Sequence, residues 1–104
     1  MMLHGTRGAM RGAWVYIMTN RRNGTLYLGV TSDLVRRAWE HRMGIVDGFT
    51  KRYGLKPLVY AEHHDDNRSA IRREKTLKQW PRAWKVRLIL AGNPAWADLY
   101  DDLK

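Results

Sequence analysis

The chain has 104 residues, enough for one compact domain but hardly for two. Its 19 Lys and Arg residues against 10 acids give a formal charge of +9, which favours nucleic acid as a partner over a merely soluble basic surface or an acidic membrane. The lack of cysteine excludes disulfides and thiolate metal sites, and no apolar run approaches the ~18–20 residues that span a bilayer.

The start and the end of the chain carry different expectations. Residues 1–11 contain no apolar stretch of the signal-peptide type, so we expect a flexible N-terminal arm on a cytoplasmic protein that does not enter a membrane. We expect the folded domain over residues 12–92. Residues 93–104 are expected to form a C-terminal helical tail packed on the same domain.

Two short runs of β-forming residues come first, at 14–19 and 25–30. Asn23-Gly24 between them predicts a type I′ hairpin turn, because both residues tolerate positive φ. That turn pairs Met18 with Gly29.

The same register fixes the faces of the hairpin. Side chains alternate along a strand, so Tyr16 and Tyr27 share one face, while Val15, Ile17 and Leu28 share the other, aliphatic face. A loop longer by an even number of residues keeps this parity.

The rest of the chain alternates helices with one more strand. Thr31 or Ser32 can cap a helix that runs to about Met43. A loop punctuated by glycines follows, and residues 57–63 read as a third strand. Asp65, Asp66 or Asn67 then opens a second helix, which ends near Trp80 because Pro81 cannot continue it.

Pro81 suits the first turn of a third helix, over residues 82–91 and closed by Gly92. Asn93-Pro94 then begins a short last helix that carries Asp98, Asp101 and Asp102. The order β-β-α-β-α-α with a short C-terminal helix predicts an α+β fold, in which helices flank a small three-stranded antiparallel sheet.

Glu74 is the most informative residue of the second helix. At 100° per residue it falls within the apolar arc formed by Ala70, Ile71 and Leu77. A carboxylate that points toward the core requires a cation or a metal. An i,i+4 ion pair with Lys78 and a loosely held Mg²⁺ are equally good explanations.

Arg37 and His41 lie four residues apart on the first helix and therefore share one ridge, whereas Arg36 points away. An arginine can hold a phosphate, and a histidine can orient water or carry a proton. Stacking of His41 on Trp39 or on a tyrosine is the alternative.

The remaining cations predict a surface that follows the phosphates of a nucleic acid. The candidates are Arg36, Lys51, Arg52, Arg73, Lys78 and Arg82. Trp80 and Trp84 lie among such cations and could stack on bases, although core packing is the favoured interpretation. His63 and His64 face opposite ways on a strand, so they are not expected to bind a metal together.

Together these residues resemble the GIY-YIG nuclease superfamily. The half-motifs stand as Trp14-Val15-Tyr16 and Tyr27-Leu28-Gly29, followed by the Arg37 and His41 helix and by Glu74 within Arg72-Arg73-Glu74-Lys75. The likeness runs from about Gly12 to Tyr100 and is closest to small single-domain bacterial members related to the N-terminal nuclease domain of excinuclease C. Trp14 replaces the first glycine of the motif, which removes no chemical group.

The resemblance implies hydrolysis of a nucleic-acid phosphodiester, with DNA favoured over RNA, and with one divalent metal, Mg²⁺ before Mn²⁺. It implies that Tyr16 acts as or near the general base, that Tyr27 positions water or phosphate, and that Arg37 neutralises the phosphate. His41 would orient Tyr16 or relay its proton, and Glu74 would hold the metal. Arg37, the metal and the positive field are expected to lower the pKa of Tyr16 from about 10. Asn93 is a further candidate, because family members often carry a late asparagine near the site.

Two other interpretations stay open at this point. The chain could be a binding module for nucleic acid that keeps the fold without catalysis. It could also be a nuclease that needs a partner protein for targeting, since 104 residues leave little room for a separate recognition domain.

Overall fold

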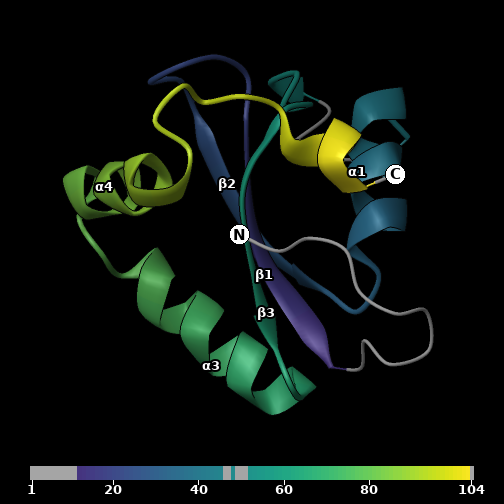
Figure 1. Cartoon of the computed structure of the whole chain (residues 1–104), viewed down its shortest axis with the longest axis vertical. Coiled ribbons are helices and arrows are strands. Elements are labelled where there is room, and N and C mark those ends of the chain that lie inside the picture. Colours follow the sequence, from purple (N-terminus) through teal and green to yellow (C-terminus); the bar gives the residue numbers. More distant parts are fainter. Residues whose placement is uncertain (1–11, 46–47, 49–51, 104) are drawn as a thin grey trace.

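Three antiparallel strands form the centre of the molecule (Figure 1). The central strand β1 (Ala13–Thr19) lies between β2 (Leu26–Thr31) and β3 (Leu58–His64). The computed structural model describes residues 12–45, 48 and 52–103.

Helices cover both faces of this sheet. Helix α1 (Leu34–Met43) lies on one face, and α3 (Asn67–Lys78) and α4 (Arg82–Gly92) lie on the other (Figure 1). The short 3₁₀ helix η1 (Leu99–Leu103) packs on the α1 side. The predicted α+β class and the order β-β-α-β-α-α are therefore confirmed.

The hairpin differs from its predicted register by two residues. Tyr16, rather than Met18, pairs with Gly29, and Thr19 pairs with Leu26. A type I′ turn is excluded, because Asn23 has a φ of +57° whereas Gly24 has no positive φ. The longer loop is closed by side chains: the Asn20 amide oxygen accepts from the Thr25 backbone N–H at 3.0 Å.

The shift by two residues leaves the two faces of the sheet as predicted. Val15, Ile17 and Leu28 pack in the core beneath α3 and α4, together with Ala70 and Leu77 of α3. Tyr16 and Tyr27 belong to the core beneath α1. Face parity survives because side chains repeat every two residues along a strand.

Some predicted helix boundaries are wrong by one or two residues. Asp33, and not Thr31 or Ser32, caps α1 by accepting from the Arg36 N–H at 3.2 Å. The Thr31 hydroxyl instead accepts from the Asp33 N–H at 3.1 Å, which shapes the turn before the cap. Asp66 caps α3, as one of the three candidates predicted.

The last segment also departs from the expectation. Helix α4 ends at Gly92 with Asn93 as its C-cap, and η1 begins only at Leu99. Asp98 precedes η1 and ties it to the fold: its carboxylate pairs with Arg42 of α1 and accepts from the Leu58 N–H at 3.1 Å. Within the described residues, no helix has the length and apolar character needed to cross a bilayer.

Candidate active site

A buried tyrosine and a buried histidine meet between β1 and α1. The Tyr16 Oη and the His41 Nε2 are 3.2 Å apart, and both residues are 3 % exposed. Tyr16 comes from the central strand, whose alternation turns its ring toward α1, and His41 lies on the helix ridge that faces the sheet. The predicted pair is thus brought together.

Tyr27 completes a cluster of three rings. Its ring centroid lies 6.2 Å from that of Tyr16 and 5.8 Å from that of His41. Of the two stacking partners considered for His41, the tyrosines are the ones it lies against, whereas Trp39 is 45 % exposed.

Gly29 lies directly beneath the Tyr16 ring, a contact that the sequence pattern did not predict. A Cβ atom at this position would lie 2.5 Å from the Tyr16 Oη and 2.6 Å from its Cζ. The phenol ring therefore occupies the space that any other residue at position 29 would fill. Only the true hairpin register, which sets Gly29 opposite Tyr16, reveals this contact.

Arg37 lies beside the ring cluster, on the same ridge of α1 as His41. Its guanidinium pairs with Glu40 at 3.4 Å, and Arg36 pairs with the other oxygen of Glu40 at 3.4 Å. Arg36, Arg37 and Glu40 line a hollow of about 250 Å³ at the start of α1. Of the two arginines, Arg37 is the one whose charge lowers the pKa of both Tyr16 and His41, as a lesser cause than burial.

Arg37 acts on the pKa of Tyr16 in the expected direction, but burial outweighs it. Burial, followed by the proximity of Tyr27, raises the pKa of Tyr16 well above its ordinary value, and the opposing charge of Arg37 is too weak to reverse this. Because burial disfavours the phenolate, Tyr16 is a neutral hydrogen-bond donor at physiological pH.

Burial has the opposite effect on the pKa of His41, the hydrogen-bond partner of Tyr16. Burial first and the charge of Arg37 second lower the pKa of His41, so its imidazole is neutral at physiological pH. A neutral Nε2 can accept the phenol proton when Nδ1 carries the ring hydrogen. The Nδ1 atom is buried and has no hydrogen-bond partner among the described residues, which is a cost that functional sites tend to carry.

Glu74 comes from a different helix than Arg37 and His41. Glu74 lies on α3, which packs on the opposite face of the sheet, and its carboxylate pairs with the Lys78 ammonium at 3.0 Å. Its side chain is only 15 % exposed, as expected for a residue within the apolar arc. Ile71, which was expected to share that arc, is 44 % exposed.

A site for a divalent metal must be judged on the donors present. Among the described residues, no three His, Asp or Glu side chains gather in a way that could hold a metal. Mg²⁺ needs no such cage, because it commonly binds through one or two carboxylates and completes its shell with water and substrate phosphate. The half-buried carboxylate of Glu74 fits that use, provided that the exposed Lys78 ammonium moves aside.

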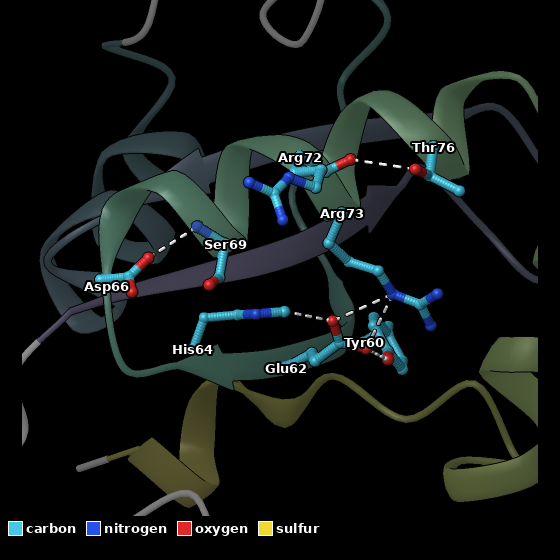
Figure 2. A network of polar contacts seen from close by, with 8 residues as sticks. All are labelled: Tyr60, Glu62, His64, Asp66, Ser69, Arg72, Arg73 and Thr76. Atoms are coloured by element: carbon cyan, nitrogen blue, oxygen red, sulfur yellow. Dashed lines mark hydrogen bonds and ion pairs between the residues drawn. The ribbon is translucent and has the colours of Figure 1, made fainter.

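Most of the predicted phosphate-binding cations have partners within the protein. Arg73 donates to Glu62 at 3.1 Å (Figure 2), and Arg82 donates to the Gly24 carbonyl at 2.6 Å. Arg36 and Lys78 form the ion pairs described above. Arg52 is exposed, and Lys51 lies outside the described residues.

The structure also shows the contacts of Asn93, the two adjacent histidines and Trp84. The Asn93 amide donates to the Val59 carbonyl at 3.1 Å and to the Ala97 carbonyl at 2.8 Å, and it accepts from the Ala97 N–H at 3.0 Å. His63 packs on the edge of Trp14, and His64 bonds Glu62 at 2.5 Å (Figure 2). Trp84 is not a core residue as favoured, because it is 47 % exposed.

Known proteins resemble this chain over most of its length. The family described as the GIY-YIG catalytic domain matches residues 12–87. A UPF0213 protein of Desulfotalea psychrophila is 31% identical over 86% of this chain and 83% of its own length. One from Staphylococcus saprophyticus is 33% identical over 76% and 95%, respectively.

A solved structure supports the same assignment. The solution NMR structure of the UPF0213 protein BH0048 from Bacillus halodurans is 27% identical, with a TM-score of 0.52, over 81% of this chain and 88% of that one. The family match at residues 12–87 spans both strands of the hairpin, α1 and α3, which carry the tyrosines, Arg37, His41 and Glu74. The chain belongs to the GIY-YIG family, within its group of small UPF0213 proteins.

Proposed function

We propose that this chain is a metal-dependent endonuclease that hydrolyses phosphodiester bonds in DNA. The observation that carries the proposal is the Tyr16–His41 pair, in which a neutral phenol and a neutral imidazole are 3.2 Å apart beside Arg37. The membership of the GIY-YIG family supports a nuclease-type activity in general. DNA, the metal requirement and the residue roles are proposed here.

The pair supplies a route for one proton. Water attacks the phosphorus atom and gives a proton to the Tyr16 Oη, while the phenol proton passes to the His41 Nε2. The bond from phosphorus to the leaving oxygen breaks, and that oxygen takes a proton from solvent. His41 then returns its proton to solvent, so the raised pKa of Tyr16 is no obstacle, because free phenolate never accumulates.

The other residues position the reacting groups. Arg37, half-exposed at the edge of the hollow of about 250 Å³, binds the phosphate and stabilises the charge that develops on it. Tyr27, within 6.2 Å of Tyr16 by ring centroid, orients the attacking water. Glu74 holds the divalent metal, Mg²⁺ or Mn²⁺, which when bound supplies charge stabilisation at the phosphate oxygens.

The test compares two neighbouring arginines that share one carboxylate. Arg37→Ala is expected to lower the metal-dependent cleavage rate by roughly 10²–10³-fold, the usual effect of removing one transition-state donor. Arg36→Ala breaks the matching ion pair with Glu40 but keeps Arg37, and the Arg36 side chain is 74% exposed, so we expect a change of less than about threefold. Cleavage of branched, flapped and duplex DNA by the purified chain is measured with Mg²⁺, with Mn²⁺ and with EDTA.

Three results would overturn the proposal. One is wild-type protein that cuts none of these DNAs with either metal, which would favour the non-catalytic binding module. Another is cleavage that continues in EDTA. The third is an equal loss in both arginine variants, which would show that only the shared ion pair matters. If cleavage appears only after co-purification with a second protein, the proposed chemistry stands and targeting belongs to that partner.

The dependence on pH separates the proton route from a free phenolate base. Protonated His41 cannot accept a proton, and its pKa is lowered, so the rate should fall about tenfold per pH unit below a midpoint under about 6.5. Above that midpoint the rate should be flat through neutral pH. Single-turnover rates between about pH 5 and pH 9 provide the measurement, and His41→Gln should abolish the acidic limb. A rate that climbs steadily to the alkaline end would instead identify Tyr16 phenolate as the base.

A further inference from the structure

Trp84 lies on the surface of α4, where a tryptophan is costly. It is 47 % exposed and stands edge-on to Trp80, with ring centroids 5.7 Å apart and an interplanar angle of 77°. Large exposed aromatic side chains are enriched where proteins bind partners. The edge-on contact with Trp80 supports the Trp84 ring, while about half of the side chain remains exposed to solvent.

Exposed cations line two hollows that share Trp80, and Trp84 lines one of the two. One hollow of about 420 Å³ is lined by Trp80, Trp84 and Arg87, and another of about 400 Å³ is lined by Arg72, Lys75 and Trp80. We call these five residues the tryptophan surface. Its three cations are exposed and form no ion pair within the described part of the chain, unlike Arg73 and Lys78 of α3.

The chemistry of the tryptophan surface selects its ligand. Three exposed positive charges favour a polyanion as ligand, and a partly exposed indole offers a flat face on which a base can stack. Paired bases in a duplex are stacked on each other and do not offer a free face, whereas unpaired bases do. An apolar protein partner would leave the three cations desolvated without a counter-charge.

We propose that the tryptophan surface binds single-stranded nucleic acid, with one base stacked on Trp84 and phosphates on Arg72, Lys75 and Arg87. This inference rests on the proposed function, since it names the part of the substrate that lies outside the catalytic site. It assigns recognition of an unpaired strand to the catalytic domain itself.

The surface lies within reach of the ring cluster. Arg82 at the start of α4 donates to the carbonyls of Asn23 at 2.9 Å and Gly24 at 2.6 Å, which fixes α4 to the hairpin loop. Tyr27 follows Gly24 by three residues, a span of about 10 Å. An unpaired strand that continues from a scissile bond near Tyr27 can therefore pass over the hairpin end to α4.

The test is direct binding in EDTA, where no cleavage can occur. Fluorescence anisotropy of labelled oligo-dT is compared with that of a blunt duplex of equal length. Trp84→Ala should weaken binding of the single strand by roughly five- to a hundredfold and that of the duplex by less than about twofold. Trp39→Ala is the matched control, because this side chain is 45 % exposed but lies on α1, on the other face of the sheet. Trp84→Phe keeps a ring and should restore most of the affinity.

The outcomes divide cleanly. Equal losses in the Trp84 and Trp39 variants, equal losses for single strand and duplex, or wild-type protein with no preference for the single strand would each overturn the inference. Unchanged melting temperatures of the variants exclude misfolding as the cause. Because binding is read without metal, the inference can fail while cleavage is retained, and it can stand in a protein that cuts nothing.

Discussion

Tyr16→Phe is expected to lower the rate of phosphodiester cleavage by roughly 10²–10⁴-fold, the usual contribution of a general base or of the group through which it acts. The variant removes one hydroxyl and keeps the ring that packs over Gly29, so the fold and the affinity for DNA should persist. The hydroxyl is the only link in the proposed route between the attacking water and the His41 Nε2. Single-turnover cleavage, with DNA affinity measured in parallel, checks the result.

Tyr60→Phe is the matched control for that experiment. This variant also loses a half-buried hydroxyl, whose pKa is raised mainly by burial. The Tyr60 hydroxyl donates to Glu62 at 2.5 Å (Figure 2). It pairs with Ile17 and therefore lies on the opposite face of the sheet from Tyr16. Its cleavage rate should stay within about threefold of wild type. Near-normal activity in Tyr16→Phe would exclude Tyr16 from the proton route.

Glu74→Gln should abolish the response to divalent metal. Loss of the metal's charge at the phosphate costs several kcal/mol of transition-state stabilisation, or at least about a 10²-fold fall in rate. The substitution keeps the size of the side chain, so the core around Ala70 and Leu77 should be undisturbed. Rates as a function of Mg²⁺ and Mn²⁺ concentration, together with calorimetric titration of Mn²⁺, provide the measurement.

Lys78→Ala decides between the two explanations of Glu74. If the i,i+4 ion pair is the whole role of Glu74, removing either partner of the 3.0 Å contact should have the same small effect. If Glu74 holds the metal, Lys78→Ala frees its carboxylate, and the metal concentration needed for half-maximal activity should fall or stay unchanged. A Glu74→Gln variant that keeps its metal response would contradict the metal role.

The fold could be predicted from the sequence because its signals are periodic. Alternating apolar residues placed Tyr16 and Tyr27 on one face of the hairpin, and that placement is confirmed although the register was wrong by two residues. The loop contains a turn closed by the Gly24 N–H and the Arg21 carbonyl at 2.9 Å, and the Asn20 side chain accepts from the Thr25 N–H, whereas Asn23-Gly24 alone suggested a two-residue turn. The cap of α1 was missed for a similar reason, since Thr31, Ser32 and Asp33 are all good caps and only the tertiary path selects among them.

The candidate site was predictable in its members but not in its electrostatics. Helix spacing placed Arg37 and His41 on one ridge, and the structure sets both beside Tyr16. The net shift of the Tyr16 pKa could not be predicted, because the degree of burial is a property of the packed core and outweighs a single nearby guanidinium. The exposure of Trp84 was equally hidden, because Arg82, Lys85 and Arg87 are spread around α4 among apolar residues, so the sequence marks no single solvent-facing side.

The contact between Tyr16 and Gly29 also constrains which substitutions can remove the Tyr16 ring without loss of packing. The Tyr16 ring on β1 packs directly against the Cα atom of Gly29 on β2. A Cβ atom at position 29 would lie 2.5 Å from the phenol oxygen. A small residue at position 16 alone leaves a cavity in the core, and a larger residue at position 29 alone displaces the Tyr16 ring. A well-packed scaffold that lacks the whole ring therefore requires paired replacement at positions 16 and 29, so that the volume lost from one strand is returned on the other.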